Sequence, residues 1–274
     1  MLICKTPITS SSICQQCQII FCRFLRKERI VSTILYLPGT REEDLNFRNR
    51  YTQITSVSEL GVRDLQGGRN RRAELLGNKL QKYEYDEKRL QIPRNNLRAD
   101  IQKSVVKMAL DIAHYGSSFG ENCLVLDLGC GIDVQALYAP YCDSRFVIGI
   151  DVAVNWKQMA KGNITGTLFD VIQSDMSDHF PFRTCVFDTV ISVSALQWLF
   201  IRSSAPLLLD VFFRSVSSVL RQGGTGTVQF YPRNTHDVHN AISAADVYFK
   251  GALIADYPHP ERGKKLFLSL SKVD

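Results

Sequence analysis

Apolar residues follow two different periods along the second half of the chain. Short runs that are apolar at nearly every position alternate with longer segments in which apolar residues recur every three or four positions. The first pattern is typical of strands buried on both faces, and the second of amphipathic helices. Strands are predicted at residues 123–128, 145–151, 166–172, 187–193, 227–231, 252–255 and 265–270.

Helices are predicted between several of these strands. The first begins near residue 97, ends before Gly116 and buries one face made of Ile101, Val105, Met108 and Ile112. The second begins at Ser204, which can cap it, carries Pro206 in its first turn and stops at the glycine pair 223–224. The third runs from residue 235 to about 250.

The alternation of strands and helices indicates an α/β fold. It predicts a parallel sheet with helices on both faces, followed by an antiparallel ending. Residues 1–80 are predicted to be a basic, poorly ordered leader, and residues 81–274 the folded domain. Apolar runs are interrupted by charges before they reach the length of a bilayer span, so no transmembrane helix is expected.

The net charge of +6 is distributed unevenly. Residues 1–104 contain 19 Lys and Arg against 11 Asp and Glu, whereas residues 105–274 contain 14 against 16. A basic first part favours a polyanionic partner such as RNA, or is simply a solvated leader. The acid-poor first 40 residues also have the composition of a mitochondrial transit peptide. Eight cysteines without regular spacing predict reduced thiols of an intracellular protein.

A glycine-containing turn follows the first predicted strand of the domain. Ligands of open α/β sheets bind beyond the carboxyl ends of the strands. Gly129 and Gly131 allow a sharp turn and a close approach to a ligand, and Asp127 precedes them. Asp151 ends the next strand and Asp175 follows the third. The three carboxylates predict a nucleotide-type ligand, or else they cap the strands of a ligand-free sheet.

Two ligands are compatible with a turn of this kind. A dinucleotide requires a third glycine and a helix N-terminus for its pyrophosphate, whereas this turn continues through Asp133, which repels phosphate. S-adenosylmethionine has no phosphate and carries a sulfonium and an ammonium group. The acids therefore favour S-adenosylmethionine as the cofactor.

Three segments carry a family resemblance: the turn Asp127-x-Gly129-x-Gly131, the Ser-Ala-Leu-Gln-Trp segment 194–198 and the Gln-Phe-Tyr-Pro segment 229–232. At these residues the chain resembles class I S-adenosylmethionine-dependent methyltransferases, and among them the eukaryotic 18S ribosomal RNA (guanine-N7) methyltransferase family. The resemblance covers about residues 119–272. It implies a doubly wound, mostly parallel seven-stranded sheet and methylation of one guanine in small-subunit ribosomal RNA. It also implies a small zinc-binding activator subunit, and a location in the nucleus, the nucleolus and the cytoplasm, with the mitochondrion as an alternative.

The resemblance and the strand ends together assign roles to particular residues. Gln197 is expected to hydrogen-bond the guanine edge, and the rings of Trp198 and Tyr231 to face the purine; alternatively, Trp198 is a core aromatic. No metal site is predicted. The cofactor is expected to contact Asp127, Gly129, Cys130, Gly131, Asp151, Val152, Asp175, Met176 and Ser194.

Two functions stay open at this point. The first is an RNA guanine-N7 methyltransferase that acts during ribosome biogenesis. The second is a ribosome-assembly scaffold with the same fold and little or no turnover, because Asp133 stands where the family has a small residue. A small-molecule methyltransferase is a further alternative. The activator has a physical motive, since a sheet edge and the Phe-rich segment 211–213 are expected to leave apolar surface exposed.

Overall fold

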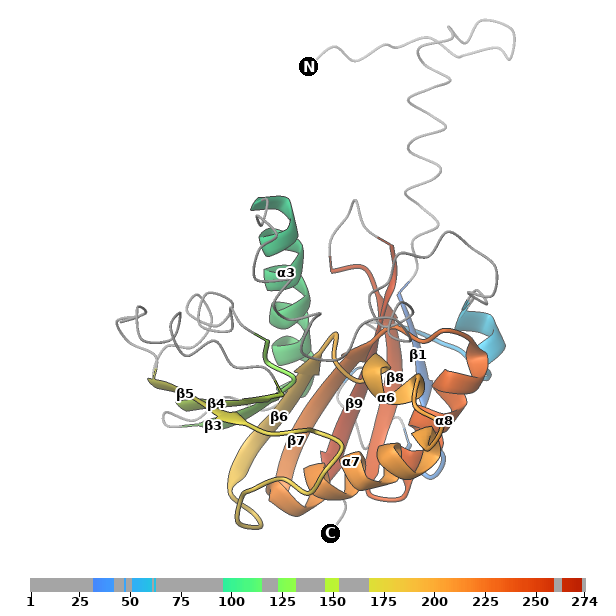
Figure 1. Cartoon of the computed structure of the whole chain (residues 1–274). Coiled ribbons are helices and arrows are strands. Elements are labelled where there is room, and N and C mark those ends of the chain that lie inside the picture. Colours follow the sequence, from blue (N-terminus) through green and yellow to red (C-terminus); the bar gives the residue numbers. More distant parts are fainter. Residues whose placement is uncertain are drawn as a thin grey trace, which may run out of the picture.

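One nine-stranded sheet dominates the computed structural model (Figure 1). The structure describes residues 32–41, 47, 51–60, 62, 96–114, 123–131, 146–152, 168–258 and 263–272. In the sheet the strands follow the order β2-β1-β8-β9-β7-β6-β3-β4-β5. Their bounds are β1 Thr33–Tyr36, β2 Thr52–Gln53, β3 Leu124–Leu128, β4 Phe146–Asp151, β5 Leu168–Gln173, β6 Phe187–Val193, β7 Leu220–Phe230, β8 Phe249–Asp256 and β9 Lys265–Lys272.

Five neighbouring strands form the parallel half of the sheet. β3 pairs in parallel with β4 and β6, and these pair in parallel with β5 and β7. β9 is antiparallel to both of its neighbours, β7 and β8. The mostly parallel sheet and its antiparallel ending are therefore confirmed, and all seven predicted strands are present.

Helices cover both faces of this sheet (Figure 1). Helix α3 (Asn96–Ala113) contacts β6, β7 and β9 on one face. Helix α7 (Ala205–Val219) contacts β7 and packs beside α8 (Thr235–Asp246). Along β3, Val125 belongs to the cluster around α3, whereas Leu126 and Leu128 belong to the cluster around α7. This alternation makes the strands apolar throughout, because both of their faces are buried.

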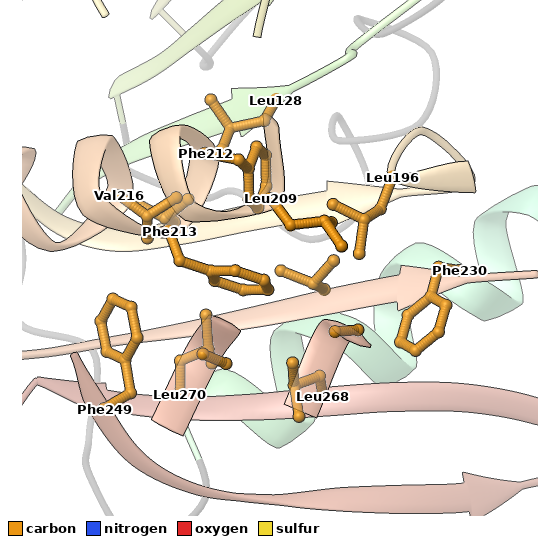
Figure 2. Packing of buried hydrophobic residues seen from close by; sticks show 14 of the residues in the cluster. Leu128, Leu196, Leu209, Phe212, Phe213, Val216, Phe230, Phe249, Leu268 and Leu270 are labelled. Atoms are coloured by element: carbon orange, nitrogen blue, oxygen red, sulfur yellow. The ribbon is translucent and has the colours of Figure 1, made fainter. Parts of the chain in front are cut away.

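The larger core lies between α7 and the sheet (Figure 2). Phe212 and Phe213 are fully buried there, and the ring of Phe213 meets that of Phe249 edge-on at 6.4 Å between centroids. The prediction that the Phe-rich segment of this helix exposes apolar surface is therefore wrong for these two phenylalanines. Their helix turns this side inward, where the two rings pack in the core against Phe249 and the leucines of the sheet. The core side chains labelled in the figure include Leu128, Leu196, Leu209, Val216, Phe230, Leu268 and Leu270.

Two strands come from the segment that was assigned to the leader. β1 pairs antiparallel with β8, and Ser32 Oγ donates a hydrogen bond of 2.6 Å to Asp256 Oδ1 at the end of this pairing. β2 extends the edge by one more short strand. Ile34 and Leu37 are buried, so this part of the N-terminal segment belongs to the folded core. The predicted boundary at residue 80 lies outside the described residues.

Several element ends differ from the sequence-based prediction. Helix α7 ends at Val219, and the glycine pair expected to stop it lies inside β7. The side chain of Ser204 makes no capping hydrogen bond, whereas Asn234 caps α8 by accepting from the Asp237 amide at 3.0 Å. Helix α8 ends at Asp246, about one turn earlier than predicted. Among the described residues, no helix is long and apolar enough to cross a membrane.

Two leucines of α7 provide a matched test of this packing. Leu209 is fully buried, whereas Leu207 is 63% exposed on the same helix. Leu209→Ala is expected to lower the free energy of unfolding by about 3–5 kcal/mol, because it leaves a cavity in a close-packed core. Leu207→Ala is expected to change it by less than about 0.5 kcal/mol. Urea unfolding followed by circular dichroism measures both, and equal losses would contradict the placement of α7.

Candidate active site

The candidate site lies where the parallel strands end. Because β3, β4, β5, β6 and β7 run in one direction, the turns that follow them lie along one edge of the sheet. This is the edge at which open α/β sheets bind ligands. All twelve predicted site residues lie in or directly after these strands.

The turn after β3 lies directly against the turn after β6. Gly129 has a φ of +73°, and its amide donates to the carbonyl of Ile150 at 2.8 Å. A Cβ atom on Gly129 would lie 2.3 Å from the Cβ of Ala195 and 3.9 Å from the sulfur of Met176. The turns after β3, β5 and β6 therefore meet around a position that only glycine can occupy.

Gly131, two residues further along the same turn, contacts the last residue of β4. Its amide donates to Asp151 Oδ2 at 2.8 Å, and its φ is +70°. A Cβ atom added to Gly131 would lie within 4 Å of no atom of the described residues. The main chain at Gly131 therefore lies beside the partly buried carboxylate of Asp151 with no described side chain packed on it, and the partly buried Val152 follows Asp151.

The acid after β5 is joined to the loop that follows α6 (Gln197–Phe200). Asp175 Oδ1 accepts a hydrogen bond from the Ser177 amide at 3.0 Å. Arg202 donates to Ser177 Oγ at 2.8 Å, and its guanidinium lies 3.9 Å from Asp175 Oδ2. Arg202 thereby links the loop that carries Asp175 and Met176 to the loop that follows Gln197 and Trp198.

The electrostatic character of the glycine turn is negative. Cys130 is almost completely buried beneath Gly149, and burial raises the pKa of its thiol well above the usual value. The negative charges of Asp127 and Asp151 raise this pKa further. Asp127 itself is only 4% exposed, so its charge acts from below the turn. A cationic ligand is favoured by such a site, and a phosphate is repelled.

The turn after β6 holds the predicted substrate residues. Ser194 has a φ of +59°, which is unusual for a residue with a side chain. Its carbonyl accepts a hydrogen bond of 2.6 Å from Gln197 Nε2. The Oε1 atom of Gln197 is buried and has no hydrogen-bond partner among the residues that the structure describes. An unpaired buried acceptor of this kind can receive a donor from a ligand.

The two aromatic candidates lie at neighbouring strand ends. Trp198 is partly buried in α6 and packs against the core around α7, as the core-aromatic alternative expects. Tyr231 follows β7 directly and is half-buried. The ammonium group of Lys265 lies 5.0 Å from the centroid of the Tyr231 ring. One face of Tyr231 is therefore taken by a cation of the chain itself.

Comparison with known proteins identifies the family. A methyltransferase domain family matches residues 126–228, the part that contains the glycine turn. The 18S rRNA (guanine-N(7))-methyltransferase of Bos taurus is 33% identical over 207 residues, which cover 74% of this chain and 72% of the relative. The chain belongs to the 18S ribosomal RNA (guanine-N7)-methyltransferase family. The family's enzyme from Mus musculus is 31% identical over the same shares, and a probable member from Dictyostelium discoideum is 31% identical over 64% of this chain and 62% of that relative.

Solved methyltransferases also resemble the chain in shape. The N-methyltransferase NodS of Bradyrhizobium japonicum, in complex with S-adenosyl-L-homocysteine, matches with a TM-score of 0.48 and 11% identity over 69% of this chain and 93% of that chain. A chain from a complex of the Trm112 methyltransferase activator with a methyltransferase of Haloferax volcanii matches with a TM-score of 0.45 and 18% identity over 64% of this chain and 91% of that chain. At such identities no shared activity follows.

S-adenosylmethionine is the cofactor of this methyltransferase family, and the turn fits it. The negative charges of Asp127 and Asp151, which act on the glycine turn, suit a sulfonium and an ammonium group. Asp133, which raised the alternative of a weak cofactor site, lies outside the described residues. In the described part of the chain, no three His, Cys, Asp or Glu side chains gather as metal ligands.

Three residues of the site were not predicted from the sequence. Arg202 was missed because its partners Asp175 and Ser177 lie far from it in the chain. Ser192 Oγ donates to the carbonyl of Leu128 at 2.9 Å, and the side chain of Gln229 accepts from Ser194. A signal existed for the last two, because both are polar residues inside otherwise apolar strands. Cys130 was expected at the cofactor, but its side chain packs into the core around α3.

The raised pKa of Cys130 gives a test by thiol labelling. In the folded protein the thiol of Cys130 stays protonated at pH 8 and is buried, whereas the thiol of Cys185 is exposed to solvent. Iodoacetamide at pH 8 is expected to modify Cys185 at least about tenfold faster than Cys130. Peptide mapping by mass spectrometry measures both rates.

The same shift has a defined sign for stability. The unfolded chain loses this proton at a lower pH than the folded protein, so the contribution of Cys130 to stability is complete below about pH 8.5 and declines as the pH rises further.

The labelling experiment has unfolded protein as its control, because urea denaturation exposes Cys130 and restores its reactivity toward iodoacetamide. Equal labelling of the two cysteines in the folded protein would contradict the buried, negatively charged turn.

Proposed function

We propose that this protein transfers a methyl group from S-adenosylmethionine to N7 of a guanine in small-subunit ribosomal RNA during ribosome biogenesis. The observation that carries the proposal is the meeting of Gly129, Ala195 and Met176 at the strand ends of a chain that belongs to this enzyme family. This contact joins the cofactor turn to the segment that precedes Gln197 and Trp198. The donor and the acceptor of the methyl group are thereby brought to one edge of the sheet.

The residues around the glycine turn hold the cofactor in this proposal. Asp151 accepts hydrogen bonds from the ribose hydroxyls while it fixes the Gly131 amide at 2.8 Å. Asp175 and Met176 are proposed to contact the adenine, the first at its amino group and the second at its ring face. Arg202 holds the loop that carries both residues. Asp127 contributes negative charge from beneath the turn, and Ser194 borders the turn through its neighbour Ala195. Cys130 acts through its main chain, since its thiol is buried.

The chemistry requires little beyond alignment. S-adenosylmethionine supplies an electrophilic methyl group on its sulfonium. Guanine N7 has an in-plane lone pair and no proton, so this chain needs no general base there. Alignment of the reacting atoms alone can contribute about 7–11 kcal/mol in favourable systems. The role of the protein is then to fix the guanine, and to tolerate the positive charge that moves onto the purine.

Gln197, Trp198 and Tyr231 are proposed to hold the guanine. The unpaired Oε1 atom of Gln197 is a suitable acceptor for the N–H groups of the guanine edge. The rings of Trp198 and Tyr231 lie after β6 and β7, on the same side as the cofactor turn. Lys265 lies over one face of the Tyr231 ring.

A charge-removing substitution tests the cofactor assignment. Asp151→Asn keeps an oxygen for the Gly131 amide but loses the charge and one acceptor, which is worth about 1.5–3 kcal/mol and predicts at least tenfold weaker binding of S-adenosylmethionine. Asp210→Asn is the matched control, because Asp210 pairs with Arg214 on α7. Isothermal titration measures the two affinities.

The function is then tested in cells depleted of the protein. We expect 7-methylguanosine to disappear from one position of the small-subunit RNA, and wild-type protein but not Asp151→Asn to restore it. Mass-spectrometric mapping of the RNA reports the result. Wild-type protein that restores subunit assembly without restoring the methyl group would favour the scaffold alternative.

The proposed location is tested in the same cells. A fluorescent fusion of the protein is expected in the nucleus, the nucleolus and the cytoplasm, rather than in mitochondria.

A small zinc-binding activator subunit is the proposed protein partner. One sheet edge, at β8, is covered by β1. Among the described residues, the outer side of β5 pairs with no strand, so its main-chain groups can accept a strand from a partner. Co-expression with the activator is expected to raise the yield of soluble protein. An isolated chain that is soluble, monomeric and fully active would contradict the need for this partner.

A further inference from the structure

A completely buried glutamine lies where the turns after β6 and β7 meet. Gln229 precedes the last residue of β7, between the buried residues Val228 and Phe230. An amide in such a place costs free energy unless it is hydrogen-bonded. Gln229 Oε1 accepts from Ser194 Oγ at 2.9 Å, and its Nε2 donates to the carbonyl of Phe230 at 3.2 Å. Both ends of the buried amide therefore have partners.

Ser194 is held by Gln229 at two points. Besides the side-chain hydrogen bond, the Ser194 amide donates to the main-chain carbonyl of Gln229 at 3.0 Å. The φ of Ser194 is +59°, a left-handed conformation that is unfavourable for a residue with a side chain. The hydrogen bonds to Gln229 offset this cost and make the left-handed turn the stable one.

This turn sets the position of two groups of the site. Directly after it, Ala195 lies against Gly129 of the cofactor turn. The carbonyl of Ser194 accepts from Gln197 Nε2, and Gln197 Oε1 is a buried acceptor that finds no partner in the described part of the chain. A change in the conformation of Ser194 would therefore move Gln197 relative to the cofactor turn.

We propose that Gln229 is a positioning residue for methyl transfer: its side-chain hydrogen bond to Ser194 holds the left-handed turn that aligns Gln197 with the guanine. The consequence for catalysis rests on the proposed function, whereas the consequence for the turn does not. Gln229 lies below the surface and contacts no substrate. Its loss should therefore lower the rate of the bound complex more than the affinity for the cofactor.

Gln229→Met in the full chain tests the proposal, because methionine has a similar length and no hydrogen-bonding amide. We expect kcat for methyl transfer from S-adenosylmethionine to small-subunit RNA of depleted cells to fall about tenfold to hundredfold. The Kd for S-adenosylmethionine is expected to change less than about threefold, since the glycine turn and Asp151 remain. Gln222→Met, an exposed position of the same strand, is the matched control and should behave as wild type.

Hydrogen exchange provides a measurement that does not depend on activity. In Gln229→Met, amide exchange of residues 194–200 is expected to become faster, while that of α7 stays unchanged. Unchanged exchange of residues 194–200, or an unchanged kcat, would overturn the proposal. A fall of kcat together with faster exchange throughout α7 and β7 would overturn it as well, because Gln229 would then support only the stability of the fold.

The proposed function and the proposed role of Gln229 fail in different ways. Wild-type protein that transfers no methyl group to this RNA contradicts the function. The exchange rates of residues 194–200 then still decide whether Gln229 holds the turn.

Discussion

The missing side chain of Gly129 is the constraint on which the site depends. It allows the turn after β3 to lie against Ala195, with the sulfur of Met176 close by. Any larger residue would push apart three strand ends that have to converge on one cofactor. The parallel sheet supplies the direction of these strands, and the glycine sets how closely the loops behind them can approach each other.

Around this contact, polar side chains connect the strand ends through hydrogen bonds that are buried or partly buried. Ser192 joins β6 to the end of β3, Asp151 joins β4 to the glycine turn, and Gln229 joins β7 to the turn after β6. In a low-dielectric interior such bonds are strong, and the loss of one partner is costly. The strand ends of the site are therefore tied to one another, and the Gly131 amide holds Asp151, one of the acids that give the turn its negative charge.

The sequence alone predicted the central sheet well, for a physical reason. Strands buried on both faces need apolar residues at every position, and such runs are easy to find. The glycine turn and its acids were visible for a similar reason, since few residue types satisfy those backbone and charge requirements. β1 escaped prediction because Thr33–Tyr36 is a short strand within the segment whose basic, acid-poor composition indicated a leader. The role of Arg202 escaped prediction because contacts between distant loops leave no pattern in the local sequence. The burial of Phe212 and Phe213 was not predicted because it depends on which side of α7 faces the sheet.

The pairing of β1 with β8 has a consequence for how the protein is made. Ser32 and Asp256, which are hydrogen-bonded at the end of this pairing, stand 224 positions apart in the chain. During synthesis β1 can pair with β8 only after nearly all of the domain has left the ribosome. Contacts of such long sequence separation form late and slowly. The nascent chain would thus pass through a stage in which a hydrophobic strand is unpaired, when a chaperone would be of most use to it.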